Sequence, residues 1–328
     1  MNRLPLGLSG TGPRPAFAAV SATLAVVALT LLASALAGRP VGAGAALHGA
    51  LLAAFMAATA AAGRLPPGGW RDAAQGLLVI GVMFFLYGSL GQLAFDAIPW
   101  TADDWLRSAD RLLGLGREPV LWAAERVAAA PAVVEPLSFV YAAFIPYLYL
   151  SIFLGLIGRP PPQRAEFITA FAILYGLSFV GYLFVPAYGP VVAMAGTFDR
   201  PLAGGAFHDL VVRSIDGMGG PHGAFPSLHV GASVMACAFD LQRGDRLRGL
   251  VYVPLVALIA VATVALRYHY VVDLLAGAAL AAVALAAARR LTDGPPRSDG
   301  RDGGRSDAGV EARLAGGADL RVDGSGAP

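Results

Sequence analysis

Two histidines stand where they could carry out nucleophilic or acid–base chemistry. His269 is followed four residues later by Asp273, and residues four apart share one face of a helix. The carboxylate can accept a hydrogen bond from one imidazole nitrogen, which leaves the other nitrogen as a nucleophile or base. His229 lies at the beginning of another apolar segment. The alternative is a His–Asp pair that only holds two helices together.

The residues around these histidines add groups that bind anions. Pro226 fits the first turn of a helix, whose free backbone N–H groups form an anion site. Ser227 adds a hydroxyl, and Arg267 adds a planar guanidinium suited to phosphate. Together with the histidines, these groups predict a phosphoryl-transfer site. We expect no metal and no cofactor, because carboxylates are scarce in these segments and Cys237 is the one cysteine.

The chain that carries these residues has the composition of a membrane protein. Of its 328 residues, 56% are hydrophobic and 14% are charged, against roughly 25% charged in soluble domains. This composition argues against a mostly soluble enzyme, a disordered chain and a nucleic-acid binder. All 24 basic residues are arginine, and the chain contains no lysine.

Apolar segments long enough for transmembrane helices recur along the sequence. A spanning helix needs about 20 mostly apolar residues. We therefore predict an all-α, polytopic membrane helix bundle with about eight transmembrane helices. The expected spans are 16–37, 43–62, 73–95, 137–158, 165–186, 225–241, 250–267 and 269–289.

Arginines in the short loops predict the orientation of the bundle. With the N-terminus in the cytoplasm, every cytoplasmic segment holds two or more arginines, and the short extracytoplasmic loops hold one or two. We therefore expect a multi-pass protein of the cell membrane with both termini in the cytoplasm. His229 and His269 then lie at the extracytoplasmic face.

The predicted organisation has three parts. Residues 1–136 hold the first transmembrane helices and an outer amphipathic helical loop at 96–136, which we interpret as a structural lid. Residues 137–291 form the expected catalytic core. Residues 292–328 are rich in Gly, Asp, Arg and Pro, and we expect a disordered cytoplasmic tail.

The segments around the two histidines resemble motifs of a known family. Gly223-Ala-Phe-Pro-Ser-Leu-His229 and His269-Tyr-Val-Val-Asp273 are similar to the second and third motifs of the type 2 phosphatidic acid phosphatase superfamily. In detail they resemble its inositol phosphorylceramide synthase and inositol phosphotransferase branch. The resemblance covers about 165–290, and Tyr182–Pro190 is similar to the Pro-rich segment before the second motif, although it also fits a turn that ends a span.

The resemblance implies a mechanism and a substrate class. His269 would be the nucleophile that takes the phosphoryl group, and Asp273 would orient it. His229 would protonate the leaving group and then activate the acceptor, which is water or an alcohol such as inositol. The phosphate oxygens would be held by Gly223, Ser227 and Arg267. The substrate would be a lipid phosphate or a phospholipid, handled through a phosphohistidine without a cofactor.

The chain also departs from the family pattern. Without lysine, the usual first motif K-x6-R-P is absent, although Arg200-Pro201 lies on the same outer side. The usual third-motif arginine corresponds to Thr263, and Arg267 lies closer to the histidine. These departures argue against an ordinary phosphatase more than against the superfamily.

Two other functions fit parts of the pattern. A transporter could use the histidines as a proton-coupled site, but such sites lie near the membrane midplane, whereas these histidines lie at span ends. A vanadium-dependent haloperoxidase shares the histidine arrangement by family, but those enzymes are expected to be soluble.

Overall fold

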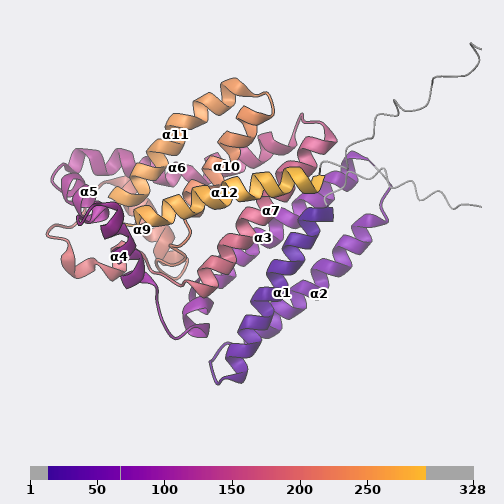
Figure 1. Cartoon of the computed structure of the whole chain (residues 1–328), viewed down its shortest axis with the longest axis horizontal. Coiled ribbons are helices and arrows are strands. Elements are labelled where there is room, and N and C mark those ends of the chain that lie inside the picture. The colour runs from indigo at the N-terminus through magenta and orange to yellow at the C-terminus, as the bar shows by residue number, and fades with distance from the viewer. Residues whose placement is uncertain (1–13, 67, 293–328) are drawn as a thin grey trace, which may run out of the picture. The chain divides into compact units, whose positions relative to one another are not determined.

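The fold is helical, as the composition and hydropathy predict. The computed structural model describes residues 14–66 and 68–292. Within these residues there are twelve α-helices and one short 3-10 helix, with no β-strand (Figure 1). The tail expected at 292–328 lies outside the described residues, except for Thr292, which ends the last helix.

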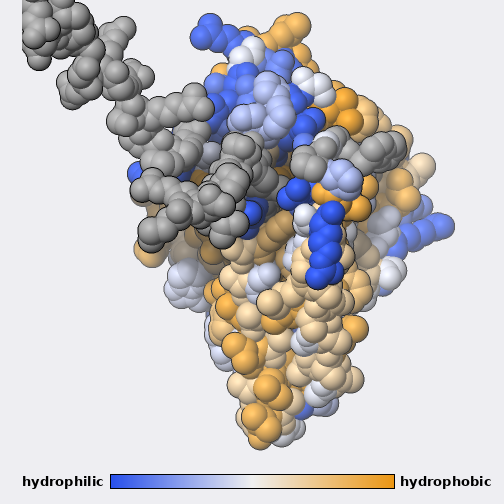
Figure 2. All heavy atoms as spheres, turned by 90° about the vertical axis from the view of Figure 1, so that its right-hand side faces the viewer, coloured by the Kyte–Doolittle hydropathy of each residue, from blue (hydrophilic) through white to orange (hydrophobic). Residues whose placement is uncertain are grey.

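Seven of the described helices are long and apolar enough to cross a membrane, so the chain is a multi-pass membrane protein. Leucines on their outer surfaces are exposed, as at Leu29 and Leu36 of the first helix. Figure 2 shows a broad hydrophobic surface over the lower part of the molecule, where the first two helices lie. The seven helices are α1 (Arg14–Leu36), α2 (Gly42–Gly63), α3 (Gly69–Ala97), α6 (Pro131–Leu156), α7 (Pro161–Phe184), α11 (Arg246–Ala265) and α12 (Val271–Thr292).

The eighth expected span, 225–241, corresponds to the shorter helix α10 (Leu228–Gln242). Its 15 residues extend for about 22 Å at about 1.5 Å per residue, less than the roughly 30 Å hydrocarbon core. It therefore does not qualify as a spanning helix by length. It packs against α7, α11 and α12, and ten of its residues are buried, so protein rather than lipid surrounds most of it.

Glycines bring α10 and α12 into close contact. A Cβ atom on Gly277 would lie 2.3 Å from the Ser227 carbonyl oxygen, and one on Gly231 would lie 3.0 Å from the Gly277 carbonyl oxygen. The backbone N–H of Ser227 also donates to the Asp273 carbonyl oxygen at 3.0 Å. The first turns of the two helices are therefore fixed against each other, and His229 and His269 are carried by these ends.

The short helices form the segments between the long ones. As predicted, 96–136 contains amphipathic helices, and the side chains of Trp105 and Leu112 are exposed. Leu106, in contrast, is fully buried against the protein. In Figure 1, two of these helices and a third from 187–224 gather at the left, where α12 begins. The short helices are α4 (Asp103–Leu113), α5 (Pro119–Ala128), α8 (Pro190–Ala193) and α9 (Ala206–Gly217), with a 3-10 turn at Ala195–Thr197.

A buried ion cluster lies at the other end of α10. Asp240 is paired with Arg159 at 2.5 Å and with Arg248, and Asp245 is 2.6 Å from Arg159. The Arg159 and Asp240 side chains are each 5% exposed. Breaking a buried pair leaves an uncompensated charge, so this cluster fixes the segment before α7 to the α10–α11 turn.

Candidate active site

The His269 ring is fixed by two oxygen atoms. Its Nδ1 atom lies 2.8 Å from the Ala224 carbonyl oxygen and 3.3 Å from Oδ2 of Asp273. Because both oxygens accept hydrogen bonds, we assign the ring proton to Nδ1, which leaves a lone pair on Nε2. Asp273 Oδ2 also accepts the Tyr270 N–H at 2.8 Å. The predicted His269–Asp273 pair is therefore present, with a backbone carbonyl as an additional partner.

His229 faces the free nitrogen of His269. The two nitrogens, His229 Nδ1 and His269 Nε2, are 3.4 Å apart, and the ring centroids are 5.5 Å apart. His229 is the second residue of α10, and His269 lies two residues before α12. The structure thus brings together three predicted site residues from separate parts of the sequence. With the proton of His269 on Nδ1, His229 is the donor in the contact between the rings.

Ser227 lies beside this group as the N-cap of α10. Its hydroxyl oxygen accepts the Val230 N–H at 3.4 Å, and the residue is fully buried. A serine N-cap satisfies one of the free N–H groups at a helix start, which explains why α10 begins here. Gly223 has φ of 65° and packs against the ring of Tyr182. Glycine suits this left-handed backbone, which turns the chain into the segment ending at His229.

Arg267 is buried, but no hydrogen bond joins its guanidinium to either histidine among the described residues. Its Nη2 donates to the Arg200 carbonyl oxygen at 2.7 Å, and the guanidinium lies 4.0 Å from the centre of the Phe198 ring. Its Nε is buried without a partner in the described part of the chain. Arg267 also has φ of 72°, a left-handed conformation that costs a non-glycine residue about 1–2 kcal/mol. Arg200 therefore contacts the Arg267 guanidinium through its backbone, while its own side chain is exposed.

The Pro-rich segment 182–190 is more than a turn at the end of α7. The Ala187 carbonyl oxygen accepts the Ala224 N–H at 3.2 Å, and Ala224 in turn holds His269. A Cβ atom on Gly189 would lie 2.5 Å from the Tyr268 carbonyl oxygen. This segment therefore packs directly against both chain segments that carry the histidines.

Several residues at the site were not predicted from the sequence. The centroid of the His229 ring lies 4.7 Å from that of Tyr141 and 4.4 Å from that of Phe144, both on α6. Two carboxylates of α4 also reach the site. Asp110 accepts the Val271 and Val272 N–H groups, and Asp103 accepts those of Tyr188 and Gly189. The signal in the sequence was a seven-residue spacing that places both acids on the buried face of an amphipathic helix.

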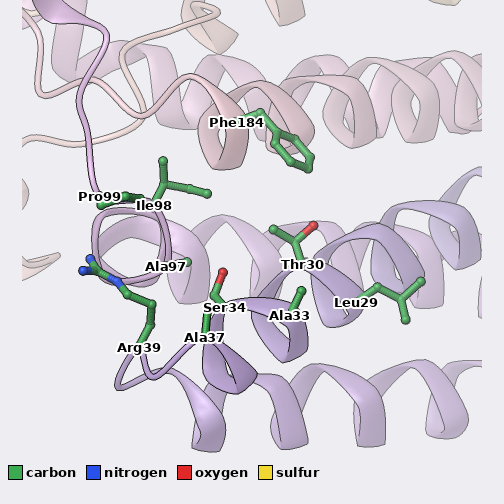
Figure 3. Close-up of a pocket in the computed structure, with 10 residues that line it drawn as sticks. All are labelled: Leu29, Thr30, Ala33, Ser34, Ala37, Arg39, Ala97, Ile98, Pro99 and Phe184. Carbon is green, nitrogen blue, oxygen red and sulfur yellow. The ribbon is translucent and has the colours of Figure 1, made fainter.

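One hollow lies away from the histidines. It has a volume of about 700 Å³ and lies where the adjoining ends of α1, α3 and α7 meet (Figure 3). Ser34 and Thr30 direct their hydroxyl groups into it, and Phe184 closes one side. None of its lining residues belongs to the histidine group. It is therefore separate from the candidate active site.

Comparison with known proteins identifies the family. No curated protein and no solved structure matches the chain. A family model described as PAP2 superfamily matches residues 104–287, which include His229, His269, Asp273 and all of α4 except its first residue, Asp103. Because this match covers more than half of the 328 residues, the chain belongs to the PAP2 (type 2 phosphatidic acid phosphatase) superfamily.

Proposed function

We propose that this multi-pass PAP2 protein is a lipid phosphotransferase or lipid phosphate phosphatase that works through a phosphohistidine on His269. Membership of the superfamily implies phosphatase or phosphotransferase chemistry. The observation that carries the specific proposal is the arrangement of three side chains. Nδ1 of His269 contacts Ala224 and Asp273, and its Nε2 faces His229 at 3.4 Å.

His269 would act as the nucleophile. An imidazole that donates through Nδ1 has its lone pair on Nε2, ready to attack phosphorus. The Asp273 carboxylate would stabilise the positive charge that develops on the ring as the N–P bond forms. Asp273 is fully buried, so this charge interaction is little screened by water.

The reaction would proceed in two displacements. In the first, Nε2 of His269 bonds to phosphorus, the bond from phosphorus to the leaving oxygen breaks, and His229, as an imidazolium, gives that oxygen a proton and becomes neutral. In the second, the oxygen of water or an alcohol attacks phosphorus and gives its proton to His229, while the N–P bond breaks. Two displacements replace one more difficult step, and both histidines return to their starting state.

The resting geometry requires His229 to move when the substrate binds. A phosphoryl group cannot fit between two nitrogens that are 3.4 Å apart. The His229 ring is flanked by Tyr141 and Phe144, so rotation along these ring faces would open the gap. The substrate would then replace the contact between the rings with its own contacts to each histidine.

Ser227, Gly223 and Arg267 would hold the phosphate oxygens. The Ser227 hydroxyl accepts the Val230 N–H and keeps its own proton for donation. The buried Nε of Arg267 is available for a charge-assisted hydrogen bond. Gly223 would contribute its backbone at the start of the motif. Arg267 would have to turn from the Phe198 ring toward the histidines.

The acceptor and the membrane face form the finer part of the proposal. The Ala224–His229 and His269–Asp273 segments, together with the lack of lysine, favour the inositol phosphotransferase branch, with inositol as the acceptor. The arginine distribution favours an extracytoplasmic site.

A panel of substrates tests the proposal. The purified protein is incubated with lipid phosphates and phospholipids, with and without inositol, and the products are identified by mass spectrometry. Release of inorganic phosphate alone indicates a phosphatase, whereas an inositol phosphate adduct that requires inositol indicates a phosphotransferase. His269→Ala should abolish either product. Wild-type turnover in His269→Ala would contradict the proposal.

A further inference from the structure

We propose that Asp110 and Asp103 of α4 are positioning residues that set the geometry of His269. This inference rests on the proposed role of His269. It assigns a function to a helix that hydropathy alone indicates as a surface lid. The evidence lies in the contacts of Asp110 with the backbone that follows His269, and in the contacts of Asp103 with the Pro-rich segment and the Tyr270 side chain.

Asp110 holds the backbone between His269 and Asp273. Its two carboxylate oxygens accept the Val271 N–H at 3.0 Å and the Val272 N–H at 2.8 Å. These are free N–H groups of the first turn of α12, which need an acceptor from outside the helix. The acceptor comes from α4, about 160 residues earlier in the chain. The relative position of His269 and Asp273 therefore depends on a carboxylate from another element.

Asp103 holds the neighbouring Pro-rich segment and contacts the residue that follows His269. Its carboxylate accepts the Tyr188 N–H at 3.1 Å and the Gly189 N–H at 2.9 Å, and the Tyr270 hydroxyl is 3.4 Å away. Tyr270 directly follows His269. Asp103 thus connects the Pro-rich segment, which supports Ala224, with the residue next to the nucleophile.

The two acids are buried, and α4 is braced. Asp103 is 4% exposed and Asp110 is 2% exposed. Burial raises the pKa of both carboxyl groups, while the backbone N–H bonds oppose that rise. Leu106 lies between them in a core that includes Ala224 and Tyr270. Because α4 contacts both the start of α12 and the Pro-rich segment that supports Ala224, a shift of this helix would move His269.

Hydrogen bonds from two arginines of α4 to Glu118 hold α4 to the next helix. This carboxylate, which immediately precedes α5, accepts hydrogen bonds from Arg107 and Arg111. A helix fixed in this way can act as a rigid support. Since displacement of a catalytic group by about 1 Å can cost about 100-fold in rate, a loose support would appear in kcat.

The test combines amide exchange with kinetics in purified, detergent-solubilised protein. Asp110→Ala should accelerate hydrogen–deuterium exchange at Val271 and Val272 and should lower kcat by about 10- to 100-fold, with KM little changed. Asp110→Asn offers one acceptor oxygen in place of two, so both effects should be intermediate. Asp103→Ala should accelerate exchange at Tyr188 and Gly189. The matched control is Asp104→Ala, which removes an exposed carboxylate from the same helix.

The possible outcomes separate this inference from the proposed function. If exchange at Val271 and Val272 in Asp110→Ala equals that in the control, the inference is wrong, whatever the activity. If exchange rises but kcat equals that of the control, the hydrogen bonds of Asp110 to α12 are only structural and the positioning role is overturned. If the wild type forms no phosphohistidine, the proposed function fails instead. Should Asp110→Ala fail to fold, the same comparisons are made with Asp110→Asn.

Discussion

At the scale of single residues, the support of His269 differs from a simple His–Asp pair. Nδ1 has two acceptors, and the shorter contact is with the Ala224 carbonyl oxygen. A backbone carbonyl fixes the tautomer but does not carry the full negative charge that stabilises a developing imidazolium. The carboxylate and the carbonyl therefore make separable contributions.

Asp273→Asn isolates the contribution of the charge. The carbonyl of Ala224 still selects the Nδ1–H tautomer, so the loss should be smaller than the roughly 10⁴-fold seen when a triad aspartate is replaced and the tautomer is lost. We expect phosphoenzyme formation to slow by about 10²-fold. Rapid-quench measurement of acid-labile phosphate on the protein checks this. A rate equal to the wild type would remove Asp273 from the mechanism.

His229→Ala distinguishes proton donation from nucleophilic attack. General acid catalysis contributes about 10²- to 10⁴-fold, so turnover of an alkyl phosphate ester should fall by this factor. A nitrophenyl ester needs no proton on its leaving group, so the first displacement should be nearly retained. His222→Ala is a suitable control, because its ring packs against Gly91 of α3. An equal slowing of phosphoenzyme formation with both esters would contradict the role of His229.

The sequence predicted the histidine group because each member has a distinctive local neighbour. His269 has Asp273 one helical turn later, and His229 follows a Pro-Ser helix start. The Ala224 carbonyl and the Tyr141 and Phe144 rings were not predictable, because a carbonyl carries no residue-type signal and aromatic residues are common in any apolar span. The predicted phosphate contact of Arg267 stays a prediction, since its Nη2 binds the Arg200 carbonyl oxygen and its guanidinium lies on the Phe198 ring, while Nε has no partner among the described residues.

At the scale of elements, the glycine contact between α10 and α12 controls the distance between the two histidines. In Gly277→Ala, the new Cβ would lie 2.3 Å from the Ser227 carbonyl oxygen, so the two helices must move apart. We expect a loss of about 1–3 kcal/mol in stability, as for an overpacked core, together with reduced kcat. Thermal unfolding in detergent and steady-state kinetics measure the two effects.

Gly81→Ala provides the matched control in α3. A Cβ atom there meets nothing within 4 Å, so the change should stabilise the helix by up to about 1 kcal/mol. If Gly277→Ala behaved like Gly81→Ala, the close contact would not control the site.

Hydropathy predicted the long helices well because each is an uninterrupted run of about 20 or more mostly apolar residues. It also placed a span on α10, whose apolar residues are buried in protein instead of facing lipid. The inward face of α4 could not be predicted in this way. The partners of Asp103 and Asp110 are backbone groups more than 80 residues away, which only the folded chain brings near.

At the scale of the whole molecule, the buried ion cluster affects how the arginine pattern is interpreted. Arg159 and Arg248, both counted as cytoplasmic, are paired with Asp240. Pairing in the folded protein does not cancel their effect on orientation, because acidic residues contribute little to the rule. The cluster lies where the spanning helices α7 and α11 begin, whereas the histidines lie beyond the ends of the same two helices, so the expected orientation places them at opposite membrane faces.

Variants with one added cysteine test this orientation. The one native cysteine, Cys237, is buried, so the wild type should not react with a membrane-impermeant maleimide in intact cells. Ser108→Cys and Ala195→Cys, in the segments expected outside, should be labelled. Leu65→Cys and Gln242→Cys, in the segments expected inside, should react only after the cells are lysed. All four positions are exposed in the structure, so accessibility within the protein does not decide the result.

The labelling pattern also decides the membrane face of the chemistry. Ser108 lies on α4, whose Asp110 contacts the start of α12 beside His269, so its label reports the side of the active site. The opposite pattern would place the histidines in the cytoplasm, where the substrate would have to come from the inner leaflet. Labels at Ser108 and Ala195 on opposite faces would contradict the fold itself, because Asp103 of α4 and Gly189, which caps the helix before Ala195, are joined by a hydrogen bond.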